Sequence, residues 1–148
     1  MQVTTATPDD YLAIVDLWEA SVRATHTFLP EEDIQMFRPL ILDQYLDAVT
    51  LRCARTTDGA ITGFLGVADN KVEMLFIDPA LMGQGIGRLL LDVAVRDLGA
   101  TLVDVNEQNP DAVGFYLHYG FELVSRDPLD GLGKPYPILH LALPEGRT

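Results

Sequence analysis

The chain has 148 residues, of which 48% are hydrophobic and 22% charged, which is the composition of one ordinary globular domain and not of a disordered segment. Its formal net charge of −12 argues against non-specific binding to nucleic acid or to a membrane, since both need basic surface, and it weakly favours a cationic partner. A single cysteine, Cys53, excludes an internal disulfide, and residues 1–6 show no secretory signal, so we expect a cytoplasmic protein.

The N-terminal half is expected to contain a strand, two helices and three further strands. Residues 2–6 form the first strand, and Thr7-Pro8-Asp9-Asp10 then supplies an N-cap, a proline at the first helical position and an acid at the third, a variant of the capping box. Apolar side chains at helical spacing predict that the next helix buries one face: Tyr11, Ile14, Val15, Trp18 and Val22. A second helical stretch covers residues 30–48. A hydrophobic period of two and two turn dipeptides then predict strands at 51–56, 61–68 and 72–78.

The C-terminal half alternates helices and strands and closes with two strands. Alternating glycines open an apolar helix that stops at a fourth glycine: Gly83, Gly85, Gly87 and Gly99. An N-cap, a proline and a terminal glycine bracket another helix: Asn109, Pro110 and Gly120. Strands are expected at 102–105, 121–125 and 136–143. The order βααβββαβαββ predicts an α/β fold, a single domain over residues 1–148 with a mixed, mostly antiparallel sheet flanked by helices.

Residues 75–88 have the pattern of a strand, a short glycine loop and the start of a helix. Such a loop makes an anion site, because glycines let a phosphate approach the backbone and the unpaired amides of the first helical turn point toward it. Arg88 would add a donor. The segment is neither a Walker A loop, since it lacks Gly-Lys-Ser/Thr, nor a dinucleotide fingerprint, since Arg88 replaces the third glycine. Taken alone, the glycines fit a tight packing turn equally well.

A second segment, about thirty residues downstream, decides between these interpretations. It places Asn109, Ala112, Phe115, Tyr116, Gly120 and Phe121 in the pattern Asn-x-x-Ala-x-x-Phe-Tyr-x-x-x-Gly-Phe. Together the two segments resemble the GNAT superfamily of N-acetyltransferases over most of the chain. The elements around Ala24-Thr25-His26, residues 106–109 and residues 133–137 are similar to a bacterial branch that includes peptidyl-lysine acetyltransferases. Met82 departs from the family, which usually has Arg or Gln there.

The resemblance implies that acetyl-CoA is a co-substrate. Backbone amides of the glycine loop would hold the pyrophosphate, and the backbone of the preceding strand would pair with the pantetheine. Asn109 would contact the pantetheine arm, although its pattern fits a helix N-cap at least as well. The residues expected to contact the cofactor are Leu75, Phe76, Ile77, Met82, Gly83, Gln84, Gly85, Ile86, Gly87, Arg88 and Asn109.

The resemblance also implies direct acetyl transfer to a primary amine in a ternary complex, with a protein lysine as the leading acceptor. Tyr116 would be the general acid that protonates the departing thiolate, whereas its alternative is a tyrosine that packs the helix on the sheet. Glu73 is the candidate base, directly or through water, because a period of two puts it on one face with Leu75 and Ile77. Its alternative is a solvated strand acid.

His26, Asn106 and Tyr136 are the candidate acceptor-binding residues. His26 follows the first helix, where the family binds its acceptor, and it could contact the substrate, act as a base or make only a structural hydrogen bond. Asn106 follows a strand end that should border the cofactor cleft, although simple loop polarity also explains it. Tyr136 lies in a rigid turn that could close the acceptor site.

Two other functions remain open from sequence. A non-catalytic acyl-CoA-binding module of the same fold would have no need of Tyr116 and Glu73, and an ATP-binding domain would need a lysine and Mg²⁺ ligands that the glycine loop lacks. Three scattered histidines and one cysteine predict no metal site. The sequence leaves the acceptor amine open, and the chain could be a monomer or a homodimer.

Overall fold

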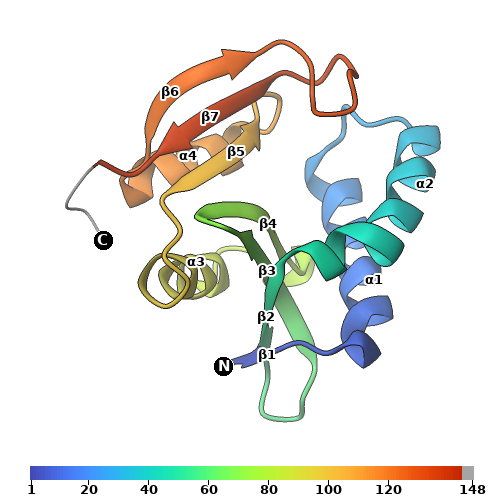
Figure 1. Ribbon diagram of the computed structural model, residues 1–148. Helices are drawn as coiled ribbons and strands as arrows, with labels where there is room; N and C mark the ends of the chain where they lie inside the picture. Colours follow the sequence, from blue (N-terminus) through green and yellow to red (C-terminus); the bar gives the residue numbers. More distant parts are fainter. Residues whose placement is uncertain (145–148) are drawn as a thin grey trace.

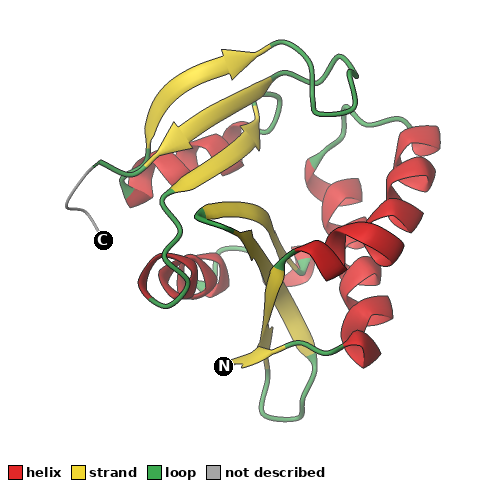
Figure 2. Ribbon diagram, viewed as in Figure 1, coloured by secondary structure: helices red, strands yellow, loops and turns green. Residues whose placement is uncertain are grey.

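The computed structural model describes residues 1–144 and contains one sheet of seven strands with helices on both faces (Figure 1, Figure 2). The strands are β1 (Gln2–Thr5), β2 (Thr50–Arg55), β3 (Ile61–Ala68), β4 (Lys71–Ile77), β5 (Leu102–Asn106), β6 (Glu122–Asp127) and β7 (Ile138–Ala142). The helices are α1 (Tyr11–Thr25), α2 (Glu31–Leu40), α3 (Ile86–Arg96) and α4 (Pro110–Tyr119). The predicted order βααβββαβαββ is confirmed, while residues 145–148 of the predicted domain lie outside the described residues.

Several predicted boundaries differ from the observed ones by one or two residues, and proline explains the differences in the second helical stretch and the last strand. The second helical stretch is α2 followed by a π-helical turn (Ile41–Tyr45) and a 3-10 turn (Leu46–Ala48), because Pro39 lacks the amide that a continuing α-helix needs. The last strand begins at Ile138 and not at residue 136, since Pro137 cannot donate to the sheet. No helix within residues 1–144 is long and apolar enough to cross a membrane.

The sheet has the strand order β1-β2-β3-β4-β5-β7-β6, and all neighbours are antiparallel except β4 and β5. The parallel pair is joined at two positions only, Lys71 opposite Leu102 and Val72 opposite Val103. Beyond Val72 the two strands diverge, as Figure 1 shows at the centre of the sheet. The sheet therefore opens between β4 and β5, and both edges of the opening are backbone.

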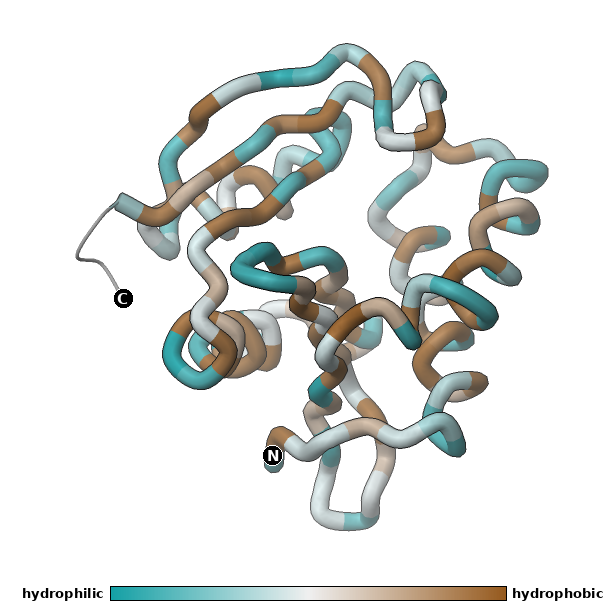
Figure 3. Tube along the Cα trace, viewed as in Figure 1, coloured by the Kyte–Doolittle hydropathy of each residue, from teal (hydrophilic) through white to brown (hydrophobic). Residues whose placement is uncertain are grey.

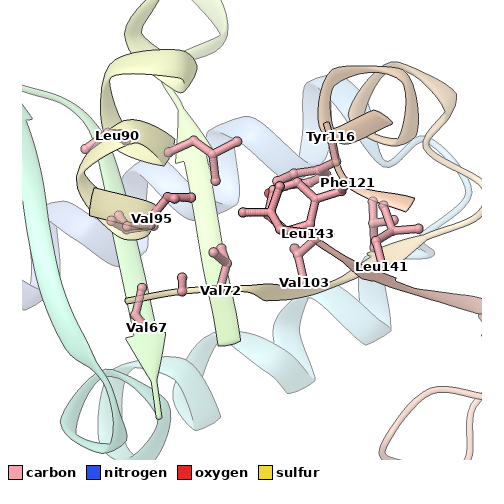
Figure 4. Close-up of a cluster of buried hydrophobic side chains, with 14 of the residues drawn as sticks. Val67, Val72, Leu90, Val95, Val103, Tyr116, Phe121, Leu141 and Leu143 are labelled. Atoms are coloured by element: carbon pink, nitrogen blue, oxygen red, sulfur yellow. The ribbon is translucent and has the colours of Figure 1, made fainter. Parts of the chain in front are cut away.

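Two hydrophobic clusters cover the two faces of the sheet. The first packs α3 and α4 onto it, with side chains such as Leu90, Val103, Tyr116, Phe121 and Leu141 (Figure 4). The second packs α1 and α2 onto the opposite face, with Ile14, Trp18, Ile34 and Phe64 among its members. Hydrophobic and hydrophilic residues alternate along these helices in Figure 3, as expected for amphipathic helices on a sheet. The core thus fixes α1 on one side of β4 and α4 on the other.

Candidate active site

The glycine loop after β4 exposes the backbone at the start of α3. Gly83 and Gly85 have φ angles of +79° and +85°, a region that favours glycine, and Gly85 is the N-cap of α3. The first bond of the helix runs from the Leu89 amide to the Gly85 carbonyl, so the amides of the preceding turn have no partner within the helix. Gly87 serves packing instead, because an added Cβ would lie 3.4 Å from the Phe115 ring.

A cleft of about 360 Å³ extends from this loop along β4 to α4. It is lined by every residue predicted to contact the cofactor except Gln84, whose side chain is exposed outside it. The guanidinium of Arg88 lies 5.2 Å from the centre of the Tyr119 ring. Asn109 is the N-cap of α4, as its pattern predicted, and its side-chain oxygen accepts a hydrogen bond from the Ala112 amide at 3.3 Å. Six further lining residues were not predicted as site residues from the sequence: Ser21, Thr25, Leu81, Asp111, Ala112 and Phe115.

The free edge of β4 forms one wall of the opening in the sheet. Leu75 and Ile77 pair with β3 on one side, opposite Leu65 and Gly63, whereas β5 pairs with no residue of β4 after Val72 on the other. Backbone amides and carbonyls along this edge are free to pair with an extended ligand, as another strand would. A smaller cavity of about 140 Å³ occupies the opening, and Tyr116 lines both this cavity and the cleft.

Tyr116 is 6% exposed, and its ring packs between Phe115 and Phe121, with centroids 5.2 and 5.7 Å away. Within residues 1–144 its hydroxyl makes no hydrogen bond, and no fully enclosed polar side-chain atom in that range lacks a partner. The hydroxyl therefore opens into the cavities that the ring lines. Burial raises the pKa of Tyr116, so the phenol stays protonated.

Glu73 does not share a face with Leu75 and Ile77, contrary to the prediction from a period of two. Gly66 pairs with Met74 and Val67 with Val72, so Glu73 is the extra residue of a β-bulge. The bulge turns Glu73 to the side of Met74, where both line a second cavity, and Glu73 also lines the cavity in the opening together with Tyr116. Partial burial of the carboxyl raises its pKa; Lys71 opposes this shift, and the charges of Asp104 and Asp69 add to it.

The second cavity, of about 200 Å³, lies on the α1 side of β4 and contains all three predicted acceptor-binding residues, His26, Asn106 and Tyr136. Its walls are mostly aromatic and aliphatic, and Glu73 and Asp130 are the carboxylates among its lining residues. The Tyr136 hydroxyl donates a hydrogen bond to the Asp33 carboxylate, which is also 3.4 Å from the Lys134 ammonium. This contact ties the turn before β7 to the start of α2 across the cavity.

The remaining histidines and the cysteine lie outside these cavities. His140 bridges two carboxylates at 2.6 Å, Asp104 through Nδ1 and Asp127 through Nε2, which together raise its pKa. His118 is exposed. Burial raises the pKa of Cys53 to about 11, so its thiol is unreactive. Among residues 1–144, no group of three or more potential ligands could hold a metal ion.

Comparisons with known proteins identify the fold. The family model of the acetyltransferase (GNAT) domain matches residues 29–130. The chain is 39% identical over 131 residues to the peptidyl-lysine N-acetyltransferase YjaB of Salmonella typhimurium, a match that covers 88% of this chain and 90% of that protein. It is 27% identical to the peptidyl-lysine N-acetyltransferase YiaC of Escherichia coli, over 76% of this chain and 77% of that one.

Solved structures agree with this assignment. The solution structure of apo YjaB from Escherichia coli superposes with a TM-score of 0.87 at 35% identity and covers 95% of both chains. The fold also matches that of yncA from Salmonella typhimurium, a putative acetyltransferase solved with acetyl-CoA, with a TM-score of 0.67 at 20% identity over 98% of this chain and 95% of that one. The chain therefore belongs to the GNAT family and is an N-acetyltransferase.

Proposed function

We propose that the protein transfers the acetyl group of acetyl-CoA to the side-chain amine of protein lysines. The observation that carries this proposal is the opening between β4 and β5, where a free tyrosine hydroxyl and a carboxylate border cavities on the two sides of one strand. The compartment would be the cytoplasm, where a free thiol such as Cys53 persists.

Acetyl-CoA fits the cleft on physical grounds. The positive φ angles of Gly83 and Gly85 expose amides for the pyrophosphate, which a protein with a net charge of −12 could hold only through such local donors. The free edge of β4 would pair with the amides of the pantetheine. Met82, exposed at the mouth of the cleft, contributes no charge where the family usually has Arg or Gln, so the backbone would carry this interaction.

A lysine side chain fits the second cavity. Its apolar stem would lie along the aromatic wall formed by residues such as Phe76 and Tyr136, and its ammonium would approach Glu73 and Asp130. The net charge of −12 favours the approach of basic protein segments. The relatives that share 39% and 27% identity are named for the same acceptor.

The chain's own residues would divide the proton transfers between them. Acetyl-CoA supplies a thioester: the amine nitrogen bonds to its carbonyl carbon, and the carbon–sulfur bond breaks with its electron pair passing to sulfur. Glu73, whose pKa is raised, would take the first proton from the ammonium and pass it to solvent. Tyr116 would give its proton to the thiolate and regain one from the acetylated nitrogen through water, so both residues end as they began.

The test replaces Tyr116 with phenylalanine, which keeps the ring packed between Phe115 and Phe121 and removes only the hydroxyl. We expect kcat to fall by about 10²–10⁴-fold while acetyl-CoA affinity changes by no more than a few-fold. Tyr119→Phe is the matched control, because it also removes a tyrosine hydroxyl from α4. That hydroxyl donates a hydrogen bond to Asp92 at 2.8 Å. Acceptors come from a thiol-release screen over lysine peptides, polyamines, aminoglycosides and amino acids. Equal turnover of both variants would exclude Tyr116 as the acid.

A further inference from the structure

His26 occupies the point where the three cavities of the site meet. Its amide caps the end of α1 with a hydrogen bond to the Val22 carbonyl at 2.7 Å. The ring is 9% exposed and lies between the rings of Phe28 and Phe76, at centroid distances of 5.3 and 6.4 Å. His26 lines the cofactor cleft, the opening in the sheet and the aromatic cavity alike. A group at this position can touch both substrates.

Two hydrogen bonds of Thr25 determine which nitrogen of His26 carries the proton. The Thr25 hydroxyl donates to the Ser21 carbonyl at 2.8 Å, a bond back to the preceding turn of α1. The same oxygen lies 2.9 Å from Nδ1 of His26. A hydroxyl has one proton and that proton is already shared with Ser21, so Nδ1 must be the donor in the second bond. The neutral ring is therefore protonated on Nδ1, and Nε2 carries a lone pair.

Nε2 of His26 is not fully enclosed. Within residues 1–144 this atom makes no hydrogen bond, and no fully enclosed polar side-chain atom of that range is without a partner, so Nε2 is accessible from a cavity. Burial lowers the pKa of His26 to about 4, which keeps the ring neutral at neutral pH and the lone pair available. Glu73 borders two of the same cavities, and Tyr116 borders two as well.

We propose that Nε2 of His26 orients the acceptor amine by accepting a hydrogen bond from one of its N–H groups. Glu73 removes a proton from the nitrogen, Nε2 holds a second N–H, and the nitrogen lone pair is left to point at the thioester carbonyl. No proton moves to His26, and no bond to it forms or breaks. Thr25 is a positioning residue, since it acts only by fixing the tautomer. This inference rests on the proposed acetyl transfer.

The decisive variants separate the two ring nitrogens. His26→Asn places an amide donor near the position of Nδ1, where it can bond Thr25, but has no atom near Nε2. His26→Gln reaches the position of Nε2 with an acceptor oxygen. We expect kcat/KM for the amine to fall about 10- to 100-fold in the asparagine variant, the loss of one hydrogen bond to a charged or reacting group. The glutamine variant should recover a substantial part of the lost kcat/KM. The KM for acetyl-CoA should stay within a few-fold of the parent in both variants.

A spectroscopic measurement on the unaltered protein is independent of turnover. Long-range proton–nitrogen NMR of the histidine rings should show Nε2 of His26 unprotonated near neutral pH, and Thr25→Val should produce a mixture of tautomers. A proton on Nε2 in the parent, or an asparagine variant that is folded and within three-fold of the parent in kcat/KM, would overturn the assignment while leaving acetyl transfer intact. A parent protein that binds acetyl-CoA and acetylates no amine would instead overturn the proposed function, and the role of His26 with it.

Discussion

The buried neutral His26 should make the stability of the protein fall as the solution becomes acidic. Its pKa is about 4 in the folded protein against an ordinary value of 6.5. The folded-state pKa is the lower of the two, so the contribution of His26 to the free energy of unfolding is complete above pH 6.5 and is lost as the pH falls toward 4. For these two values, linkage gives a loss of about 2 kcal/mol in the free energy of unfolding between pH 7 and pH 5. The ring is 9% exposed, so little solvent screening reduces this figure.

The assay is urea unfolding of the apo protein at several pH values, compared with His26→Gln, which cannot titrate. The comparison is needed because His140 acts in the opposite sense: Asp104 and Asp127 raise its pKa, so its contribution is complete below its unfolded pKa and is lost as pH rises. Subtracting the two stability curves removes His140 and every carboxylate. A difference between parent and variant that stays constant from pH 7 to pH 5 would refute the reasoning, since it would mean that His26 titrates normally in the folded state.

Three further predictions concern the site. Gly85→Ala should weaken acetyl-CoA binding by about 5- to 30-fold by calorimetry, because a side chain at φ of +85° costs about 1–2 kcal/mol and the free loop relieves this strain by leaving the conformation that exposes its amides. Gly59→Ala has similar strain at φ of +88° in the turn after β2, and equal affinity losses in the two variants would disprove a local effect. Glu73→Gln should remove the acidic limb of the kcat/KM profile, whose midpoint is shifted upward from the ordinary glutamate pKa because burial raises the pKa of Glu73; persistence of the limb would assign it to another group. Tyr136→Phe should lower the unfolding free energy by about 1 kcal/mol in urea, since Asp33 loses a donor, and no change would mean that Lys134 alone satisfies this carboxylate.

The parts of the fold that local chemistry dictates could be predicted from sequence. Asn109 and Gly120 bracket α4 as their capping preferences require, and the glycines before α3 open the loop as expected. The residues that line the cleft were largely predictable for the same reason: apart from Asn109, the predicted ones form a continuous strand–loop–helix segment. Gln84 alone lies outside the cleft, because the side chain in that turn points to solvent.

The other side of the site depends on contacts that no local pattern contains. The bulge at Glu73 arises from the register between β3 and β4, so alternation along β4 assigned the carboxylate to the wrong face. The bond between Tyr136 and Asp33 joins residues 103 positions apart. The tautomer of His26 follows from the rotamer of Thr25, which helix propensity does not specify. The opening between β4 and β5 could not be predicted either, because each segment has the pattern of an ordinary strand.

The pairing of β4 and β5 at only two positions has a consequence for how fast the protein is degraded in the cell. Opening the arm of β5, β6, β7 and α4 away from β4 breaks few sheet hydrogen bonds and the contacts of that arm in the first hydrophobic cluster. It leaves the second cluster intact, so partial opening costs less free energy than global unfolding. A pantetheine arm bound between β4 and β5 would contact both strands and stabilise the closed form. Proteases cut the opened form, and the protein with acetyl-CoA bound between β4 and β5 would open less often. The concentration of acetyl-CoA would then set the rate at which the protein is degraded as well as the rate at which it works.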